Sequence, residues 1–471
     1  MKNIKSTLGL VIVDGVGFRN FILSDFLKEA KQQFQEVIIF SGLPVSVYNK
    51  FKVSDCIIVE LDDYREPGKT WFFRKLKENA HLQNNKKGNF GIQDNLKVTY
   101  SLDNSRRGKL TRLIFKWSKN FHSERWIEIY YRLQKRSISN HATTKKYRQL
   151  LKKHSPDVLF FTHQRPPYIA PLIVASAEEG IRTCSFIFSW DNLASKGRMA
   201  GNFENYFVWS DLMKTELLQF YKIIKEDQIR VIGTPQFEPY VLDRYKKEKQ
   251  EFFSRFQLEK NKKTICFSCG DVSTSKNDPL YISTIARNIL KGNLADDVNF
   301  LVRTSPAEEP TRFEELQQEF PFIKWNFPKW EISRKNHSEP WSQRIPSQED
   351  MLDLRMILEY SDVGINMCST MSLDFMTFDK PIINPVFGNK ENGLYDDQRF
   401  LKYAHYQRVV ESGAVFIAKN ELELIDGINR SLLNPGKMKE ERRNLLKLQV
   451  GKPLKGTSER IAIALKKLQL S

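Results

Sequence analysis

Three hydroxyl side chains in the C-terminal half of the sequence could together hold a phosphate group. Ser369, Thr370 and Ser372 belong to a polar loop, residues 366–372, which follows a predicted buried strand and precedes a predicted helix. Unpaired N–H groups at the start of a helix, together with hydroxyl groups, can bind phosphate without a lysine or a metal ion. The same hydroxyls could instead only cap the helix, and this stretch alone favours neither interpretation.

Three other side chains could act as a general base. Asp191 follows one predicted strand, His163 follows the preceding strand, and Asp14 lies in a glycine-containing loop after the first strand. Because ligands bind beyond the carboxyl ends of parallel strands, all three should lie at one edge of a sheet. A base is needed to take the proton of an acceptor hydroxyl group. A helix-capping role for Asp191 and a structural role for His163 stay open as alternatives.

Basic and small residues near these candidate bases could bind an acceptor. Lys196 and Arg198 follow Asp191 closely and could hold an anionic acceptor or the leaving phosphate. The predicted acceptor-binding residues are Gly15, Gly17, Arg165, Asn192, Lys196 and Arg198.

The sequence predicts no metal site. The six histidines other than His163 lie in polar or basic stretches without paired ligand spacing. Cys266 and Cys269 form a C-x-x-C pair, but a zinc site would need a second pair of ligands, and the surrounding residues predict a strand. We therefore expect reduced, buried cysteines and a reaction that uses neither a metal ion nor a cofactor.

Strands and helices alternate around these candidate residues. Residues 8–13 form a continuous apolar run, typical of a parallel strand that is buried on both faces. A glycine loop, a helix predicted at 20–34 and a strand predicted at 37–40 follow, which is how a Rossmann-like domain begins. Further strands are predicted at 56–60, 158–161, 183–188, 206–209 and 229–232.

A second alternating series indicates a second domain, since 471 residues exceed what one hydrophobic core supports. The charged stretch 243–263 predicts a solvated helix that joins the halves. We expect an N-terminal domain at 1–254, with an insertion at about 65–153, and a C-terminal domain at 255–471 whose last helix, 456–468, packs back on the first domain. Strands of the second series are predicted at 264–269, 298–303, 362–367, 381–385 and 414–418.

The surroundings of the hydroxyl loop resemble a known superfamily. A strand that starts at Asp362, the run 369–372, Asp374, and Lys380-Pro381 before another strand are similar to the donor half of GT-B glycosyltransferases. They are also similar to the related CDP-glycerol glycerophosphotransferases and UDP-N-acetylglucosamine 2-epimerases. The resemblance implies an α/β fold of two Rossmann-like domains facing a cleft, with this loop around the donor diphosphate. It gives Asp374 a contact with ribose or sugar, although these families commonly have glutamate there.

Three more stretches match the same pattern. Residues 233–238 resemble the Gly-x-Pro turn that closes the first domain, and residues 267–271 resemble the first loop of the second. Residues 301–306 are similar to an Arg-x-His-Pro strand end, but Ser305 replaces the histidine, so a phosphate contact is weakened or passes to Arg303. The donor-binding residues that the resemblance implies are Gly270, Asp271, Arg303, Ser369, Thr370, Met371, Ser372 and Asp374.

Positive charge is concentrated in one segment. The chain has a net charge of +18, and residues 65–153 contribute +17 of it, with 23 lysines or arginines against 6 acidic residues. Apolar residues from Leu110 to Phe121 follow helical spacing beside basic residues, which indicates peripheral binding to an anionic membrane surface. A plain helical layer on the first domain is the alternative. No recognisable DNA or RNA module is present, so we expect no nucleic-acid partner.

These features predict a GT-B-type glycosyltransferase of polysaccharide biosynthesis in the cell envelope. It would move a sugar from a nucleotide-sugar donor to a cell-surface glycan or its lipid-linked precursor, without a metal ion. Transfer of a phosphoalditol from a CDP-linked donor, epimerisation of a UDP-sugar, and a non-catalytic membrane-associated binding protein are the alternatives. Because no apolar run is long enough to span a bilayer and no secretory signal is recognisable, the predicted location is the cytoplasm, at the inner face of the membrane.

Overall fold

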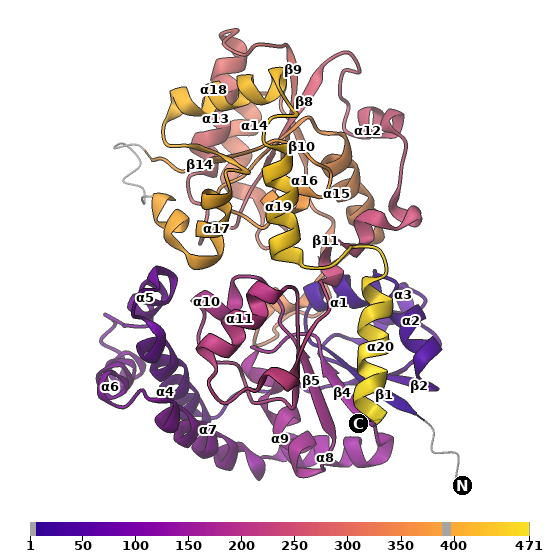
Figure 1. Ribbon diagram of the computed structural model, residues 1–471, viewed down its shortest axis with the longest axis vertical. Helices are drawn as coiled ribbons and strands as arrows, with labels where there is room; N and C mark the ends of the chain where they lie inside the picture. The colour runs from indigo at the N-terminus through magenta and orange to yellow at the C-terminus, as the bar shows by residue number, and fades with distance from the viewer. Residues whose placement is uncertain (1–5, 389–396, 471) are drawn as a thin grey trace. The chain divides into compact units, whose positions relative to one another are not determined.

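The computed structural model describes residues 6–388 and 397–470, and the chain divides into two compact units. Unit 1 takes in Met1–Gln236, Ile332–Ile345 and Gln449–Ser471, and unit 2 takes in Phe237–Glu331 and Pro346–Leu448 (Figure 1). Each unit is built around its own parallel β-sheet. Unit 1 is therefore assembled from three separate stretches of the chain.

The sheet of unit 1 has seven parallel strands in the order β3-β2-β1-β4-β5-β6-β7. Every residue of β1 is buried, as expected for an apolar central strand covered on both faces. The strands are β1 (Thr7–Ile12), β2 (Glu36–Ser41), β3 (Ile57–Glu60), β4 (Val158–Phe161), β5 (Arg182–Phe186), β6 (Asn205–Val208) and β7 (Ile229–Val231).

Helices cover both faces of this sheet. The single helix predicted at 20–34 is wrong, because the chain breaks there into α1 and α2, and the Ser24 hydroxyl accepts a hydrogen bond from the Phe26 N–H at 3.2 Å. The elements are α1 (Gly15–Ile22), α2 (Phe26–Gln33), α3 (Val45–Lys50), α9 (Ala170–Glu178), α10 (Asn192–Ser195) and α11 (Asp211–Phe220), with 3-10 helices η1 (Pro167–Ile169), η2 (Glu226–Gln228) and η6 (Pro340–Gln343).

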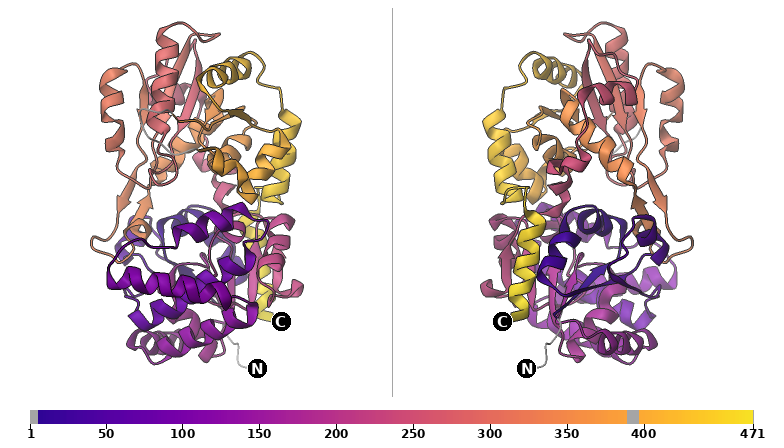
Figure 2. Two further views of the ribbon diagram at one scale, coloured as in Figure 1. Left: turned by 90° about the vertical axis from the view of Figure 1, so that its left-hand side faces the viewer. Right: turned by 90° about the vertical axis from the view of Figure 1, so that its right-hand side faces the viewer.

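The basic segment forms a helical layer inserted between β3 and β4. Its long helix α4 packs against both α6 and α7, and Leu76, Ile114 and Ile127 are buried where they meet. These helices face the viewer in the left panel of Figure 2. They are α4 (Gly68–Asn85), α5 (Phe90–Val98), α6 (Arg106–Asn120), α7 (Glu124–Ser139) and α8 (Ala142–His154).

Two distant parts of the sequence complete unit 1. The helix α20 (Thr457–Leu470) packs against α2 and β4, as Figures 1 and 2 show. An arm, residues 332–345, lies so close to α1 that a Cβ atom at Gly15 would sit 1.6 Å from the Arg344 carbonyl oxygen. Glycine at this position is therefore required by the approach of the arm. The arm is flanked by β11 (Trp330–Ile332) and β12 (Arg344–Pro346), which pair with each other.

The sheet of unit 2 has six parallel strands in the order β10-β9-β8-β13-β14-β15. Its strands are β8 (Lys263–Ser268), β9 (Val298–Arg303), β10 (Lys324–Asn326), β13 (Val363–Ile365), β14 (Ile382–Pro385) and β15 (Phe416–Ala418). Its helices are α12 (Lys249–Arg255), α13 (Asp278–Leu290), α14 (Glu314–Glu319), α15 (Gln348–Tyr360), α16 (Met371–Met376), α17 (Ala404–Ser412), α18 (Glu421–Leu433) and α19 (Lys439–Val450), with η3 (Pro235–Val241), η4 (Asp243–Tyr245), η5 (Pro310–Phe313) and η7 (Asp397–Lys402).

The solvated helix predicted at 243–263 is wrong over most of its length. Only α12 is α-helical there, and it is held to unit 2 by aromatic packing. Phe252 is fully buried and lies 5.8 Å from the ring of Tyr360, whose hydroxyl donates to the Lys247 carbonyl at 2.5 Å. Apolar side chains spaced among the charges thus anchor the segment to one unit.

Across residues 6–388 and 397–470 there is no helix whose length and apolar character would let it cross a bilayer. All five cysteines lie in that part of the chain and are free thiols, and the Cys266 thiol is fully buried in β8.

Candidate functional site

The loop after β1 places a carboxylate at the carboxyl edge of the unit 1 sheet. Asp14 is fully buried and caps α1, because its Oδ1 accepts a hydrogen bond from the Gly17 N–H at 2.7 Å. A side chain at Gly17 would meet the Thr162 hydroxyl at 2.8 Å, so glycine lets α1 begin close to β4. The second carboxylate oxygen of Asp14 is left to face the end of β4.

His163, two residues beyond the end of β4, meets that second oxygen. Its Nδ1 lies 2.8 Å from Asp14 Oδ2, and its ring stacks on Phe188 with centroids 3.8 Å apart and planes 10° apart. Its Nε2 has no hydrogen-bond partner among the described residues. Since a carboxylate accepts a proton on Nδ1, the neutral ring presents Nε2 as a proton acceptor. We call His163 and Asp14 the dyad.

The protonation state of His163 suits a base. Burial lowers the pKa of His163 below its ordinary value, although the hydrogen bond to Asp14 and the charge of Asp14 act in the opposite direction. The charge of Arg165 also lowers this pKa, and that of Asp191 raises it. The imidazole is therefore neutral at neutral pH.

Asp191 lies in the same surroundings but makes different contacts. Its side chain does not cap α10; it pairs with Lys196 at 3.6 Å and accepts a hydrogen bond from Asn192 Nδ2 at 3.0 Å. Asn192 Oδ1 in turn accepts from Gln164 Nε2 at 3.0 Å. The structure thus brings Asp14, His163 and Asp191 to one edge of the sheet, with Lys196 and Asn192 beside Asp191.

The remaining acceptor candidates divide. Arg165 is half-buried, and its Nε is a buried donor without a partner among the described residues. Arg198 points away into the basic helices, where its guanidinium donates to Glu124 at 2.5 Å and stacks over Tyr221 at 4.3 Å. Its burial and pairing support a structural role rather than the predicted acceptor contact. Gly15 is occupied by the close approach of the arm.

Two aromatic residues at the dyad could not be found from the sequence. Phe188 ends the predicted strand before Asp191, and nothing in its context indicated a stacking partner for His163. Trp341 comes from the arm, and its ring centroid lies 6.2 Å from that of His163. A contact across so much sequence leaves no local signal.

In unit 2, the hydroxyl loop, residues 366–372, follows the carboxyl end of β13. Its Cys368 has a φ of 46°, a left-handed conformation that turns the chain sharply. Asn366 Oδ1 holds the turn by accepting hydrogen bonds from the Ser369 N–H at 2.9 Å and the Ser372 hydroxyl at 3.1 Å. Ser369, Thr370 and Met371 remain half-exposed, whereas Ser372 is fully buried. Ser369 and Thr370 can therefore contact a ligand, and Ser372 supports the turn.

The buried side of this loop is a polar network. Ser372 Oγ lies 3.1 Å from the Tyr406 hydroxyl, which donates to Asn384 Oδ1 at 2.7 Å. Asn384 Nδ2 donates to the Asn366 carbonyl at 2.7 Å, while Asn366 Nδ2 is buried without a partner among the described residues. Such a network fixes the loop in one conformation.

Two predicted donor contacts are engaged inside unit 2. Asp374 is buried and accepts a hydrogen bond from the Tyr240 hydroxyl at 2.5 Å. Arg303 is also buried, and its guanidinium holds both carboxylate oxygens of Asp350, at 3.0 and 2.9 Å, and bonds Asn326. The contacts of Arg303 support a structural role at the end of β9 rather than the predicted phosphate contact.

The loop after β8 is braced from behind by residues that the sequence did not single out. Asp278 accepts hydrogen bonds from the Gly270 N–H at 2.9 Å and the Ser275 hydroxyl at 2.5 Å, and it pairs with Arg312 at 3.3 Å. Burial raises the pKa of Asp278 to about 7. Asp271 lies at the half-exposed tip, where it accepts from the Ser273 N–H at 3.0 Å.

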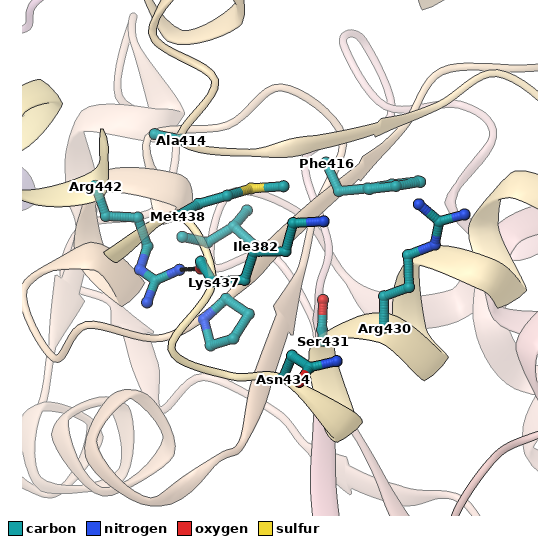
Figure 3. A pocket seen from close by; sticks show the side chains of 10 residues that line it. Ile382, Ala414, Phe416, Arg430, Ser431, Asn434, Lys437, Met438 and Arg442 are labelled. Carbon is teal, nitrogen blue, oxygen red and sulfur yellow. Dashed lines mark hydrogen bonds between the residues drawn. The ribbon is translucent and has the colours of Figure 1, made fainter. Parts of the chain in front are cut away.

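A separate pocket of unit 2 lies at the wrong edge of the sheet for a donor site (Figure 3). Its lining includes Ile382, the first residue of β14, and Phe416, the first residue of β15. Ligands of parallel sheets bind at the carboxyl ends of strands, where the hydroxyl loop lies. Arg442 closes the pocket by donating to the Lys437 carbonyl at 2.7 Å and to Asp379 Oδ1 at 3.0 Å, which favours a structural role for the pocket.

No group of three or more histidine, cysteine or acidic side chains is arranged to hold a metal ion within residues 6–388 and 397–470. The absence of metal from the proposed reaction therefore stays a prediction.

Neither a family model nor a curated protein matches the sequence. Solved structures match along nearly the whole chain. A putative UDP-N-acetylglucosamine 2-epimerase from Listeria monocytogenes has a TM-score of 0.56 at 10% identity, covering 98% of this chain and 96% of its own. A glycosyltransferase from Rickettsia africae has a TM-score of 0.54 at 14% identity, covering 99% of each chain. A UDP-GlcNAc 2-epimerase from Neisseria meningitidis, bound to UDP-GlcNAc, has a TM-score of 0.52 at 11% identity, covering 98% of this chain and 100% of its own.

These similarities confirm the predicted fold class. The chain has a GT-B-type α/β fold with two Rossmann-like units, one built on seven parallel strands and the other on six. At 10–14% identity the neighbours establish the fold alone, so the chemistry has to be argued from this chain's own residues.

Proposed function

We propose that this protein is a glycosyltransferase that moves a sugar from a nucleotide-sugar donor to a hydroxyl group of a glycan or lipid-linked glycan. The observation that carries the proposal is the dyad: His163 Nδ1 lies 2.8 Å from Asp14, and Nε2 has no partner among the described residues. An oriented, neutral imidazole at the carboxyl edge of a parallel sheet is suited to take a proton from an acceptor.

The proposed reaction divides between the two units. His163 Nε2 takes the acceptor proton while the acceptor oxygen forms a bond to the anomeric carbon of the donor sugar. The bond from that carbon to the diphosphate oxygen breaks, and the nucleoside diphosphate leaves. Ser369 and Thr370, with backbone N–H groups of the hydroxyl loop, would bind the diphosphate and stabilise its negative charge, so we propose that no metal ion is needed.

Epimerisation of a UDP-sugar is the second candidate, because several structural neighbours are named UDP-GlcNAc 2-epimerases and two were solved with UDP. The dyad is compatible with both reactions, since each requires a base. Phosphoalditol transfer and a non-catalytic binding role have less support, because neither explains why a neutral histidine is oriented by a buried carboxylate.

Product analysis in deuterated water separates the candidates. A transferase incubated with its nucleotide sugar and a glycan acceptor releases nucleoside diphosphate and extends the acceptor, without deuterium in the sugar. Inverting a carbon centre by proton removal and return would place deuterium on the sugar without any acceptor. Deuterium uptake with no extended acceptor would contradict the transferase proposal.

The pH dependence of transfer should reflect the lowered pKa of His163. Because only the neutral imidazole accepts a proton, and its pKa lies below the ordinary value of 6.5, kcat/KM should stay level from about pH 8 down to pH 6.5. It should decline only at more acidic pH. A decline already centred at or above pH 7 would assign the base to another group.

We also propose that the protein is cytoplasmic and binds the inner face of the membrane peripherally. On α6, Leu113 and Trp117 are 53% and 47% exposed beside Lys116, although Ile114 on the same helix is fully buried. Apolar side chains next to basic ones favour an anionic lipid surface. The double variant Leu113→Ser/Lys116→Glu should bind vesicles containing phosphatidylglycerol at least about fivefold more weakly, as measured by co-sedimentation. Equal binding by both proteins would contradict this.

A further inference from the structure

A pocket of about 590 Å³ opens in unit 1 beside the basic helices. Arg65 reaches it from the segment before α4, Trp71 from the first turn of α4, and Arg106 and Arg107 from the start of α6. Tyr168 lines it from η1. We call it the guanidinium pocket. Its walls come from several elements of unit 1, so it is a built concavity rather than a single charged helix face.

The positive charge of this pocket is not neutralised within the fold. Arg74, which also lines it, is fully engaged by Glu66 at 2.7 Å and Glu78 at 2.7 Å. By contrast, Arg65 and Arg106 have no ion pair or side-chain hydrogen bond among the described residues. The pairing of Arg74 also accounts for Glu66, the acidic residue nearest to Arg65 in the sequence.

The other two charged groups of the pocket leave this balance unchanged. Arg107 makes no ion pair among the described residues, and its guanidinium lies over the ring of Trp71 at 5.0 Å. Glu339 uses a carboxylate oxygen to accept from Trp341 Nε1 at 3.0 Å. Three guanidinium groups thus share one concavity with aromatic side chains, which is an arrangement suited to a ligand with both an anionic group and a ring.

Position links the pocket to the dyad. The Tyr168 hydroxyl donates to the carbonyl of Val13 at 3.2 Å, and Val13 immediately precedes Asp14 in the chain. Tyr168 also lies five residues after His163, so both follow the carboxyl end of β4. The guanidinium pocket therefore lies along the same edge of the unit 1 sheet as the proposed base.

We propose that the guanidinium pocket binds a phosphate-bearing saccharide, as the part of the acceptor that lies beyond the reacting hydroxyl. Guanidinium groups bind phosphate through paired, charge-assisted hydrogen bonds, and the faces of Trp71 and Tyr168 can pack against a sugar ring. Only the role of this ligand as an acceptor rests on the proposed transferase function. The phosphate can come from a soluble glycosyl phosphate or from a sugar linked to a lipid diphosphate.

The test measures binding of N-acetylglucosamine 1-phosphate to the full chain by isothermal titration calorimetry. N-acetylglucosamine and inorganic phosphate serve as partial ligands. The variant Arg106→Glu/Arg107→Glu should fold, because acidic residues are favourable in the first turn of a helix. It should bind the sugar phosphate at least about tenfold more weakly, since it loses two charge-assisted contacts.

A control variant carries the same change of charge elsewhere on the basic layer. Arg132→Glu/Arg136→Glu alters two exposed arginines of α7 that do not line the guanidinium pocket. This control should bind within about twofold of the wild type, because the loss is local and not a general field effect. A third variant, Arg65→Ala, changes a residue outside any helix and should weaken binding about fivefold or more.

Three outcomes would overturn the proposal: no saturable binding by the wild type, equal loss in the pocket and control variants, or binding of the neutral sugar as tight as of its phosphate. A parallel titration with a short-chain polyprenyl diphosphate sugar identifies the source, since tighter binding than that of the soluble sugar phosphate assigns a lipid-linked ligand. UDP binding, a property proposed for unit 2, should be unchanged in every variant. A chain that binds the sugar phosphate but no nucleotide would refute the proposed function while leaving this pocket assigned.

Discussion

Replacing His163 with asparagine is expected to lower kcat for sugar transfer by about 10²–10⁴-fold, the usual contribution of a positioned general base. Asparagine is the informative replacement, because its amide N–H can take the place of imidazole Nδ1 and donate to Asp14. The buried carboxylate then keeps a partner, and its cap on the Gly17 N–H is preserved. The variant therefore removes Nε2 alone, and a loss of rate reports on proton transfer rather than on folding.

The matched control is Asp191→Asn, at the other candidate base. Asp191 is half-buried and paired with Lys196, so its carboxylate is not oriented by a second buried group as His163 is. This variant should keep at least about a tenth of the wild-type rate, since its effect on His163 is electrostatic. Nucleotide binding should be unchanged in both variants. If Asp191→Asn abolishes transfer while His163→Asn retains it, Asp191 is the base and the dyad is structural.

The second large effect is expected from Asp350→Ala, which should lower the free energy of unfolding of unit 2 by about 3–5 kcal/mol. Asp350 binds the buried guanidinium of Arg303 through both oxygens and accepts from Trp330 Nε1 at 2.8 Å. Removing the carboxylate leaves a buried cation without its counter-charge, which costs far more than the ion pair itself contributes. If Arg303 were instead held ready for donor phosphate, a bound nucleotide would restore much of the lost stability.

The neighbouring residue on α15 supplies the control. Glu349 is half-exposed and pairs with Arg255 and Lys329 at the surface, so Glu349→Ala should change the stability by less than about 1 kcal/mol. Hydrogen exchange of peptides from β9 and α15 measures the effect within unit 2, where a single global transition is not assured for a two-unit chain. A loss in Asp350→Ala no larger than that in the control would show that the pair is not a structural brace.

The sequence was sufficient to predict the sheets because their strands are continuous apolar runs. The residues 8–13 and 158–161 lie in adjacent strands at the centre of the unit 1 sheet. Because the polar residues that follow such strands share an edge, Asp14, His163 and Asp191 could be grouped from the order of residues along the chain. Their grouping could not, however, show which of them pair.

What the sequence missed depends on contacts between distant residues. The hydrogen bond from His163 to Asp14, the ring of Trp341 near His163, and the ion pairs of Arg198 and Arg303 each join separate elements. Residue type suggested that both arginines bind ligand, yet burial beside a carboxylate commits each to the fold. The helix predicted at 243–263 failed for a related reason, because Phe252 is drawn onto unit 2.

The central claim is that unit 2 binds the diphosphate of a nucleotide donor at the hydroxyl loop, and a thermal-shift titration of the full chain tests it most directly. The panel consists of UDP, GDP, dTDP and CDP with their sugar derivatives, each with EDTA. One nucleotide at about 100 times its Kd should stabilise the folded chain by about 2.7 kcal/mol, and Ser369→Ala/Thr370→Val should abolish the shift. No shift with any member of the panel, or an undiminished shift in that variant, would contradict the claim.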